Sequence, residues 1–101
     1  MGKLAHKKKK ISKDCWNLDQ AFFVWLHEHL VVYLKEAGKM VDLSYHKFDY
    51  KGKKYTQEEI IKMMINDLKD IHYLDAWNPK YQELSNEILD LWKLVFHAMW
   101  W

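Results

Sequence analysis

Six histidines, one cysteine and several carboxylates are the residues of this 101-residue chain that could carry chemistry. His27 and His29 flank Glu28, but a spacing of two residues sets their rings about 200° apart on a helix, so they cannot chelate one ion. The sequence contains no His-x-x-x-His, no pair of cysteines and no His-Glu-x-x-His. A site built from His29, His72 and His97 across helices has no support in the spacing. We therefore predict no metal site and no cofactor.

A nucleophile or an acid–base pair would be the other route to catalysis. Cys15 lies beside Trp16 at a predicted helix start, and its expected role is structural. No serine lies in the Gly-rich elbow that exposes a nucleophile. Glu83, Glu87 and Asp90 follow one side of a predicted helix, which is typical of a solvated face. We predict that the protein is not an enzyme and has no small-molecule substrate. A cleft with two or more titratable groups of shifted pKa would revive the enzymatic interpretation.

Positive charge is concentrated at the N-terminus. Residues 1–13 carry six lysines and no acid, giving +6, whereas residues 14–101 carry ten lysines and fourteen acids, giving −4. All sixteen basic residues are lysine, and the missing arginine argues against sequence-specific reading of DNA bases. The pattern predicts a flexible basic arm over residues 1–13 and a single domain over residues 14–101.

The lysines also suggest a nucleic-acid-binding alternative. A run in the arm could neutralise phosphates in a salt-dependent manner, and it consists of Lys7, Lys8, Lys9 and Lys10. A second basic group with tyrosines that could stack on bases consists of Lys51, Lys53, Lys54, Tyr50 and Tyr55. Short lysine runs are also common as purely solubilising segments, so both interpretations stay open.

Six tryptophans are more than a core of this size can hide. Large aromatic residues left at a surface are typical interface anchors. We predict Trp77, Trp100 and Trp101 as anchors for a protein partner or for self-association. The alternative is that Trp100 and Trp101 fold back onto the groove between the first and last predicted helices.

The first predicted helix runs from Asn17 or Leu18 to about Ala37, with Asp14 or Asn17 as N-cap and Gly38 at the C′ position. One apolar face is expected to carry Leu18, Phe22, Trp25, Leu26, His29, Val32 and Tyr33. Val24 and Val31 lie outside this face, so we expect contacts on more than one side of the helix.

The rest of the chain predicts two further helices. Residues 39–55 are expected to form an ordered aromatic and lysine-rich loop or a short β-hairpin. Thr56-Gln57-Glu58-Glu59 reads as a capping box that starts a helix fading around residues 73–76. Its apolar stripe is expected to consist of Ile60, Ile61, Met64, Ile65, Leu68, Ile71 and His72. Asn78-Pro79 then starts a last helix that runs nearly to residue 101. The stripe of this helix is expected to consist of Tyr81, Leu84, Ile88, Leu91, Trp92, Val95, Phe96 and Met99. These elements predict a mainly all-α fold, a three-helix bundle.

Composition agrees with one folded domain, because half of the residues are hydrophobic while Gly and Pro are scarce. The lone cysteine points away from an oxidising compartment, and residues 1–12 lack the apolar segment of a secretory signal. The longest apolar stretch, residues 21–34, is interrupted by His27, Glu28 and His29, so we expect no membrane span. The expected location is the cytoplasm.

Several segments together resemble a group of small uncharacterised bacteriophage proteins. They are Trp16-Asn17-Leu18-Asp19, the spaced leucines of Leu26–Leu34, Met63-Met64-Ile65 and the aromatic stretch from Trp92 to Trp101. The resemblance covers most of residues 14–101. This chain has a longer 39–55 segment and lacks the Gly-Tyr-Pro-like turn after the first helix. The resemblance implies a phage origin and brings no catalytic residues.

The sequence as a whole favours a small non-enzymatic, phage-type interaction protein. Its expected partner is a host or phage protein, and an inhibitor of a host defence or host enzyme fits this class because occluding a site needs shape and no catalytic groups. The alternative function is non-specific association with nucleic acid through the basic arm and the lysine-rich segment.

Overall fold

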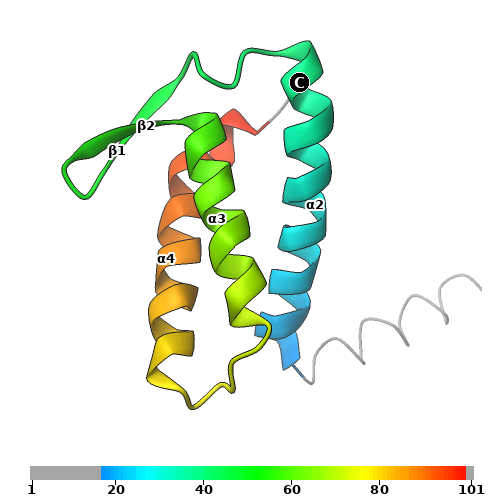
Figure 1. Ribbon diagram of the computed structural model, residues 1–101, viewed down its shortest axis with the longest axis vertical. Coiled ribbons are helices and arrows are strands. Elements are labelled where there is room, and N and C mark those ends of the chain that lie inside the picture. Colours follow the sequence, from blue (N-terminus) through cyan, green and yellow to red (C-terminus); the bar gives the residue numbers. More distant parts are fainter. Residues whose placement is uncertain (1–16, 100–101) are drawn as a thin grey trace, which may run out of the picture.

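The computed structural model describes residues 17–99, so the predictions on the basic arm, Cys15, Trp100 and Trp101 lie outside the described residues. The elements are α2 (Leu18–Met40), β1 (Lys47–Tyr50), β2 (Lys53–Thr56), α3 (Gln57–Ile71), α4 (Pro79–Val95) and the 3-10 turn η2 (Phe96–Ala98). Within residues 17–99, three helices and a hairpin between α2 and α3 confirm the mainly α prediction (Figure 1). Over this range, no helix is long and apolar enough to cross a bilayer.

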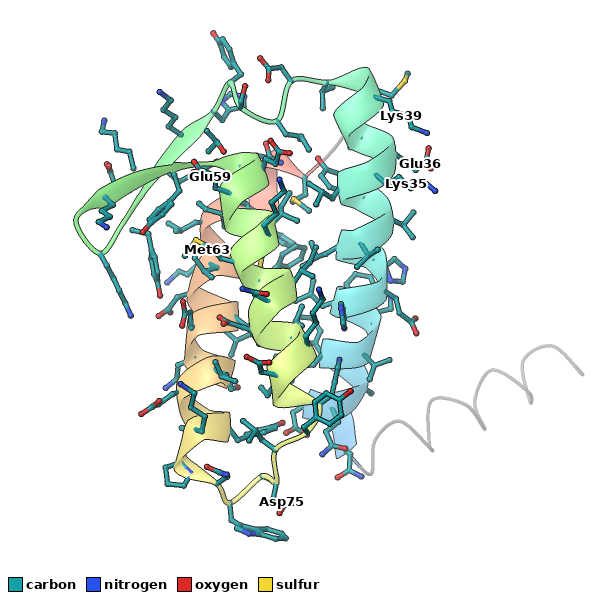
Figure 2. The ribbon with its side chains drawn as sticks, in the orientation of Figure 1. Lys35, Glu36, Lys39, Glu59, Met63 and Asp75 are labelled. Carbon is teal, nitrogen blue, oxygen red and sulfur yellow. The ribbon has the colours of Figure 1, made fainter. Side chains whose placement is uncertain are left out.

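The starts of α3 and α4 confirm the predicted caps. Thr56 Oγ1 accepts from the Glu59 N–H at 3.1 Å, while Glu59 Oε1 accepts from the Thr56 N–H at 2.8 Å. Glu59 therefore lies at the junction of hairpin and helix (Figure 2). Asn78 Oδ1 accepts from the Lys80 N–H at 2.9 Å, and Pro79 occupies the first turn of α4. Each cap satisfies a backbone donor that the helix itself leaves unpaired.

The predicted end of the first helix at Gly38 is wrong. Gly38 stays helical and α2 continues to Met40, after which the Val41 N–H still donates to the Ala37 carbonyl at 2.9 Å. The buried side chain of Leu43 folds back over this turn, with its Cδ1 3.9 Å from the position that a Cβ on Gly38 would take. Packing by Leu43 after the helix therefore overrides the local stop signal of the glycine.

The open choice between a loop and a hairpin resolves to an antiparallel hairpin with Tyr50 opposite Lys53 and Phe48 opposite Tyr55. Its two-residue turn places Lys51 at φ 50° and Gly52 at φ 81°. Positive φ at both central positions is the geometry that matches the twist of paired strands. Phe48, Tyr50 and Tyr55 are half-buried and pack against the core, so the hairpin is held through its aromatic face.

Helix α3 organises the core because it packs against both α2 and α4, whereas those two make little backbone contact with each other. In Figure 1, α3 lies between α2 and α4 and runs in the opposite direction to both. The predicted stripes of α3 and α4 are largely confirmed by the fully buried residues Ile60, Ile61, Met64, Leu68, Ile88, Leu91 and Val95. Phe96 and His72, which we also expected in these stripes, are exposed.

The predicted core face of α2 is partly wrong. The buried residues are Phe23, Leu26, Leu30 and Ala37, whereas Leu18, Trp25 and Val32 remain 64%, 47% and 57% exposed. The helix thus carries two apolar faces, and α3 covers only one of them. The charged Lys35, Glu36 and Lys39 lie on the side of α2 away from α3 (Figure 2). Periodicity alone could not separate the two faces, because their positions interleave along the helix.

Two polar ties hold α2 and α4 in place at opposite ends of the molecule. At one end, the Tyr81 hydroxyl of α4 donates to the Asp19 carboxylate of α2, and burial together with this bond raises the pKa of Tyr81 to about 12. At the other end, the buried Gln57 side chain donates to Tyr33 Oη at 3.4 Å and to the Ala98 carbonyl at 3.1 Å. Between these ties, α2 and α4 stay apart.

The glycine at position 38 generates a stability prediction. Because Gly38 is helical and an added Cβ would meet only Leu43 Cδ1 at ordinary contact distance, Gly38→Ala should raise the free energy of unfolding by about 0.5–1 kcal/mol. Thermal unfolding followed by circular dichroism should show a Tm increase of about 3–6 °C. Gly52→Ala is the opposite control: its φ of 81° strains any side chain, and a loss of stability is expected. Equal effects of the two substitutions would contradict this assignment.

Candidate functional site

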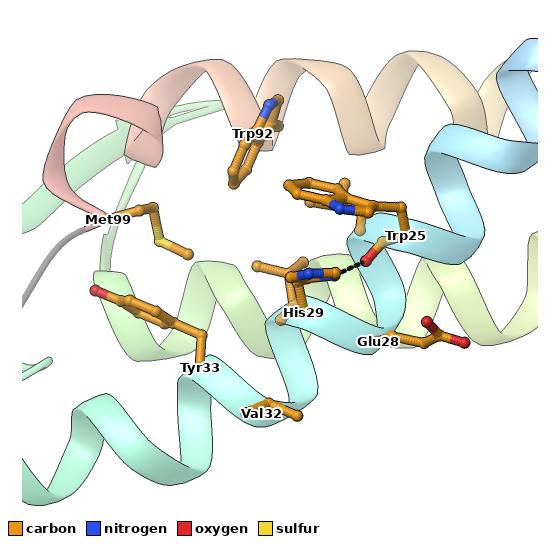
Figure 3. A pocket seen from close by; sticks show the side chains of 9 residues that line it. Trp25, Glu28, His29, Val32, Tyr33, Trp92 and Met99 are labelled. Carbon is orange, nitrogen blue, oxygen red and sulfur yellow. Dashed lines mark hydrogen bonds between the residues drawn. The ribbon is translucent and has the colours of Figure 1, made fainter. Parts of the chain in front are cut away.

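An apolar groove of about 430 Å³ lies between α2 and α4. Its lining is formed by Trp25, Leu26, Glu28, His29, Leu30, Val32, Tyr33, Trp92 and Met99. Figure 3 shows Trp25, His29 and Tyr33 of α2 on one side and Trp92 and Met99 on the other. The groove is the direct consequence of the second apolar face of α2, which α3 leaves uncovered.

A ladder of rings forms the α2 wall. The Trp25 and His29 rings stack at 4.2 Å between centroids with 25° between their planes, and the Phe22 and Trp25 rings stack at 6.3 Å. His29 Nδ1 lies 2.7 Å from the Trp25 carbonyl oxygen. Because a carbonyl can only accept, this nitrogen must carry the proton, which leaves Nε2 of the neutral ring as an acceptor. The wall is therefore both apolar and fixed in orientation.

The opposite wall comes from α4 and the turn that follows it. Trp92 is half-buried and packs edge to face on Phe96, with centroids 5.2 Å apart. Met99 is held because its sulfur lies 3.5 Å from Gln57 Nε2, which also binds the preceding carbonyl of Ala98. A buried amide of α3 thus positions the residue that closes this end of the groove.

The groove is suited to binding apolar groups and offers little to catalysis. Glu28 is its one charged lining residue, and the Glu28 side chain points away from the groove in Figure 3. Within residues 17–99, no group of three or more His, Cys, Asp and Glu side chains could hold a metal ion. The prediction that the protein is not an enzyme stays a prediction.

A pair of histidines lies on the other flank of α2. His27 Nδ1 and His72 Nε2 are 3.1 Å apart, with ring centroids separated by 5.3 Å and planes inclined by 20°. This bond needs one shared proton, so it links α2 to the end of α3 only while at most one ring is charged. Desolvation, the His72 charge and Lys69 lower the pKa of His27. His72 thus pairs with His27 and is not assembled with His29.

The predicted anchor Trp77 lies far from the groove. It is 84% exposed in the loop between α3 and α4, whereas Met99, the residue before Trp100, follows the other end of α4. A helix of 17 residues is about 25 Å long. Trp77 and the groove are therefore separate surfaces, and Trp77 does not contribute to the groove wall.

In the hairpin, the lysines and the tyrosines of the predicted nucleic-acid site lie in different environments. Lys51, Lys53 and Lys54 are exposed, but Tyr50 and Tyr55 are half-buried against the core. Lys51 Nζ lies 5.3 Å from the centre of the Tyr50 ring, so it already covers one aromatic face. The lysines are available to phosphate, while the tyrosines are used in packing.

The half-buried carboxylate of Asp67 lies on the same side of the molecule as the hairpin. Burial raises the pKa of Asp67 on α3 to about 6, and the charges of Glu87 and Asp70 contribute further. Its Oδ2 is buried and has no hydrogen-bond partner among residues 17–99. Burial, again reinforced by the charge of Glu87, raises the pKa of Tyr50. Glu83 and Asp90 are exposed and Glu87 is half-buried, and the three carboxylates line a shallow hollow with the hairpin tip.

Trp25 and Trp92 are the groove residues that we did not select from the sequence. We placed Trp25 on the predicted core face and Trp92 in the apolar stripe of the last helix. The available signal was the number of apolar positions around α2, which exceeds what one contact face can cover, as Val24 and Val31 already indicated. This signal identified α2 as a helix with more than one apolar face, but it could not identify which face would line the groove.

Comparison of the chain with protein-family models, with curated proteins and with solved structures found no match. The site is therefore interpreted from its geometry and chemistry alone.

The Asp67 carboxylate generates a pH-dependent prediction. Because its pKa in the folded protein is raised to about 6, the folded state binds the proton more tightly, and stability decreases as pH rises from about 4 to 6. The full shift corresponds to roughly 3 kcal/mol, which solvent screening should reduce to about 1 kcal/mol. Asp67→Asn should therefore stabilise the protein at pH 7 and have little effect at pH 4, measured by urea unfolding. Asp75→Asn, in the exposed loop, is the control and should not show this pH dependence.

The lowered pKa of His27 predicts a dependence of opposite sign. The unfolded chain takes up a proton first as pH falls through about 6.5, so stability should fall over that window and stay low below the folded pKa. His27→Gln should remove this loss of stability, because the group with the lowered pKa is then absent. Urea unfolding at pH 7.5 and 5 measures the difference, with the exposed His97→Gln as control. An unchanged profile in His27→Gln would contradict the assignment.

Proposed function

We propose that this protein is a non-enzymatic interaction protein that binds an apolar helical segment of a partner protein in the α2–α4 groove. The observation that carries the proposal is an open, apolar groove of about 430 Å³ whose walls include Trp25, Val32 and Trp92. Trp25 is 47% and Val32 57% exposed, so binding would remove substantial apolar surface from water. Tryptophans in such a position are typical interface hot spots.

The shape of the groove favours a helix over a small ligand. It runs along α2, and its walls present rings and aliphatic side chains with few directed polar groups. A small-molecule site usually fixes its ligand through convergent polar groups. An amphipathic helix needs only apolar side chains at spacings of three and four residues to fill such a groove.

The same proposal explains how a closed helix bundle would form from the three helices that the sequence predicts. Here α2 and α4 are tied at both ends but make little backbone contact between the ties. A partner helix in the groove would pack on both, and the four helices would then form a closed bundle around one core. On this view, the partner supplies the missing side of the bundle.

We infer a biological role of the phage type for this binding. The partner would be a host or phage protein in the cytoplasm, and occupation of its helix would inhibit it without chemistry. The resemblance of residues 14–101 to phage proteins and the apolar groove support this inference.

Nucleic-acid association is the second candidate function. The exposed Lys47, Lys51, Lys53 and Lys54 of the hairpin support an electrostatic contact with phosphates. The packed positions of Tyr50 and Tyr55 give no support to base stacking. This candidate therefore predicts weak, sequence-independent binding that decreases steeply with salt.

Two neighbouring valines of α2 provide a matched test of the docking function. Val32 lines the groove, whereas Val31 is exposed on the same helix and is not part of the lining. Val32→Glu places a charge where the partner's apolar side chains would pack, and should weaken partner binding at least tenfold, or about 1.4 kcal/mol or more. Val31→Glu should bind as the unsubstituted protein does. Capture from nuclease-treated cell lysate, followed by titration of the captured protein, measures both.

Thermal unfolding of both variants controls for folding, because both valines are exposed and neither change should alter the core. Equal binding by both variants would refute the groove as the docking site. A partner that is captured from untreated lysate but not from nuclease-treated lysate would favour the nucleic-acid candidate.

A further inference from the structure

We propose that this protein forms a homodimer in which α2 packs antiparallel against α2 of a second copy of the chain. The contact is made by the outer face of α2, which consists of Val24, Glu28, Val31 and Lys35. Neither valine nor Lys35 belongs to the core or to the groove lining, and the Glu28 side chain points away from the groove (Figure 3). The homodimer goes beyond the docking function and does not depend on it.

The outer face has the spacing of a seam between paired helices. Its four residues follow one another at intervals of four, three and four residues. This alternation keeps side chains directed at a neighbouring helix over several turns. Val24 is 45% and Val31 46% exposed, and Glu28 and Lys35 are exposed as well. The two valines therefore form an apolar line on α2 that residues 17–99 leave open to solvent.

The charges of the outer face favour a second copy of the chain in antiparallel orientation. Glu28 precedes Val31 by three residues and Lys35 follows it by four, so an acid and a base flank the valine at similar distances. A two-fold axis beside Val31 sets Glu28 opposite Lys35 of the second copy, and symmetry repeats this pair. Parallel pairing would instead set like charges against each other. The face is thus complementary to itself when the two helices run in opposite directions.

Both charges are available for contacts with the second copy. Glu28 and Lys35 lie about 10.5 Å apart along the helix axis, which is too far for a pair within one chain. None of the salt bridges among residues 17–99 involves either of them. Figure 2 shows Lys35 on the side of α2 away from α3. In the homodimer, packing of the valines supplies affinity, and the two ion pairs supply register and orientation.

The homodimer leaves the groove of each copy open. Val32 lines the groove and lies about 100° around the helix from Val31. Dimerisation and docking in the groove therefore use different sides of α2. A single pair of helices is a small interface, so we expect weak association with a Kd on the order of 10–100 μM.

Sedimentation equilibrium of the full chain from about 10 μM to about 1 mM tests the homodimer. Val31→Glu should weaken dimerisation at least tenfold, because two carboxylates then meet at the two-fold axis. Leu89→Glu is the matched control, since Leu89 is 45% exposed on α4 and should be replaceable without effect on the dimer. A monomer over the whole range, or equal dissociation of the two variants, would overturn the proposal.

Charge reversal tests the antiparallel orientation. Glu28→Lys and Lys35→Glu should each weaken dimerisation about fivefold, because each converts both ion pairs into repulsive contacts. The double substitution restores opposite charges in an antiparallel pair and should recover the original Kd, whereas a parallel pair would gain nothing from it. Thermal unfolding of each variant at low protein concentration checks that the fold is intact. A double variant as weak as the single ones would overturn the antiparallel homodimer, while the effect of Val32→Glu on partner capture would still decide the docking function.

Discussion

The buried side-chain amide of Gln57, at the start of α3, is the constraint on which the hairpin end of this molecule depends. At 3% exposure it must find its hydrogen bonds inside the protein, since an unmet buried amide costs about 1–3 kcal/mol. It finds them on Tyr33 of α2 and on the carbonyl of Ala98, and its backbone N–H donates to the His46 carbonyl. One residue at the start of α3 thereby fixes α2, the segment before the hairpin and the turn after α4.

The groove lies where α2 and α4, which polar contacts connect near their ends, make little direct contact with each other. Tyr81 and Asp19 join the starts of α4 and α2, and Gln57 joins their far ends through α3. Helix α3 covers one apolar face of α2 and leaves the face with Trp25 and Val32 open. Rigid spacing and uncovered apolar surface together give a surface shaped for a further apolar segment.

Charge is kept away from this surface. The exposed lysines of the hairpin lie on one side of the molecule, and the carboxylates Asp67 and Glu87 lie beneath the same hairpin. The groove walls carry Glu28 alone, and it points outward. The apolar groove and the exposed lysines of the hairpin are therefore different surfaces, so substitutions in one should leave the other intact.

Local signals in the sequence determined the helices, the caps at Thr56 and Asn78, and most of the buried stripes of α3 and α4, because short-range hydrogen bonds and a single apolar face specify them. Tertiary structure decided the rest. Gly38 stays helical because Leu43, five residues later, packs over it. The core face of α2 was set by which side α3 covers, and Gln57 became a central tie only because distant acceptors reach it. Contacts between residues far apart in the chain leave no trace in spacing or periodicity, and such contacts place the α2 and α4 walls of the groove opposite each other.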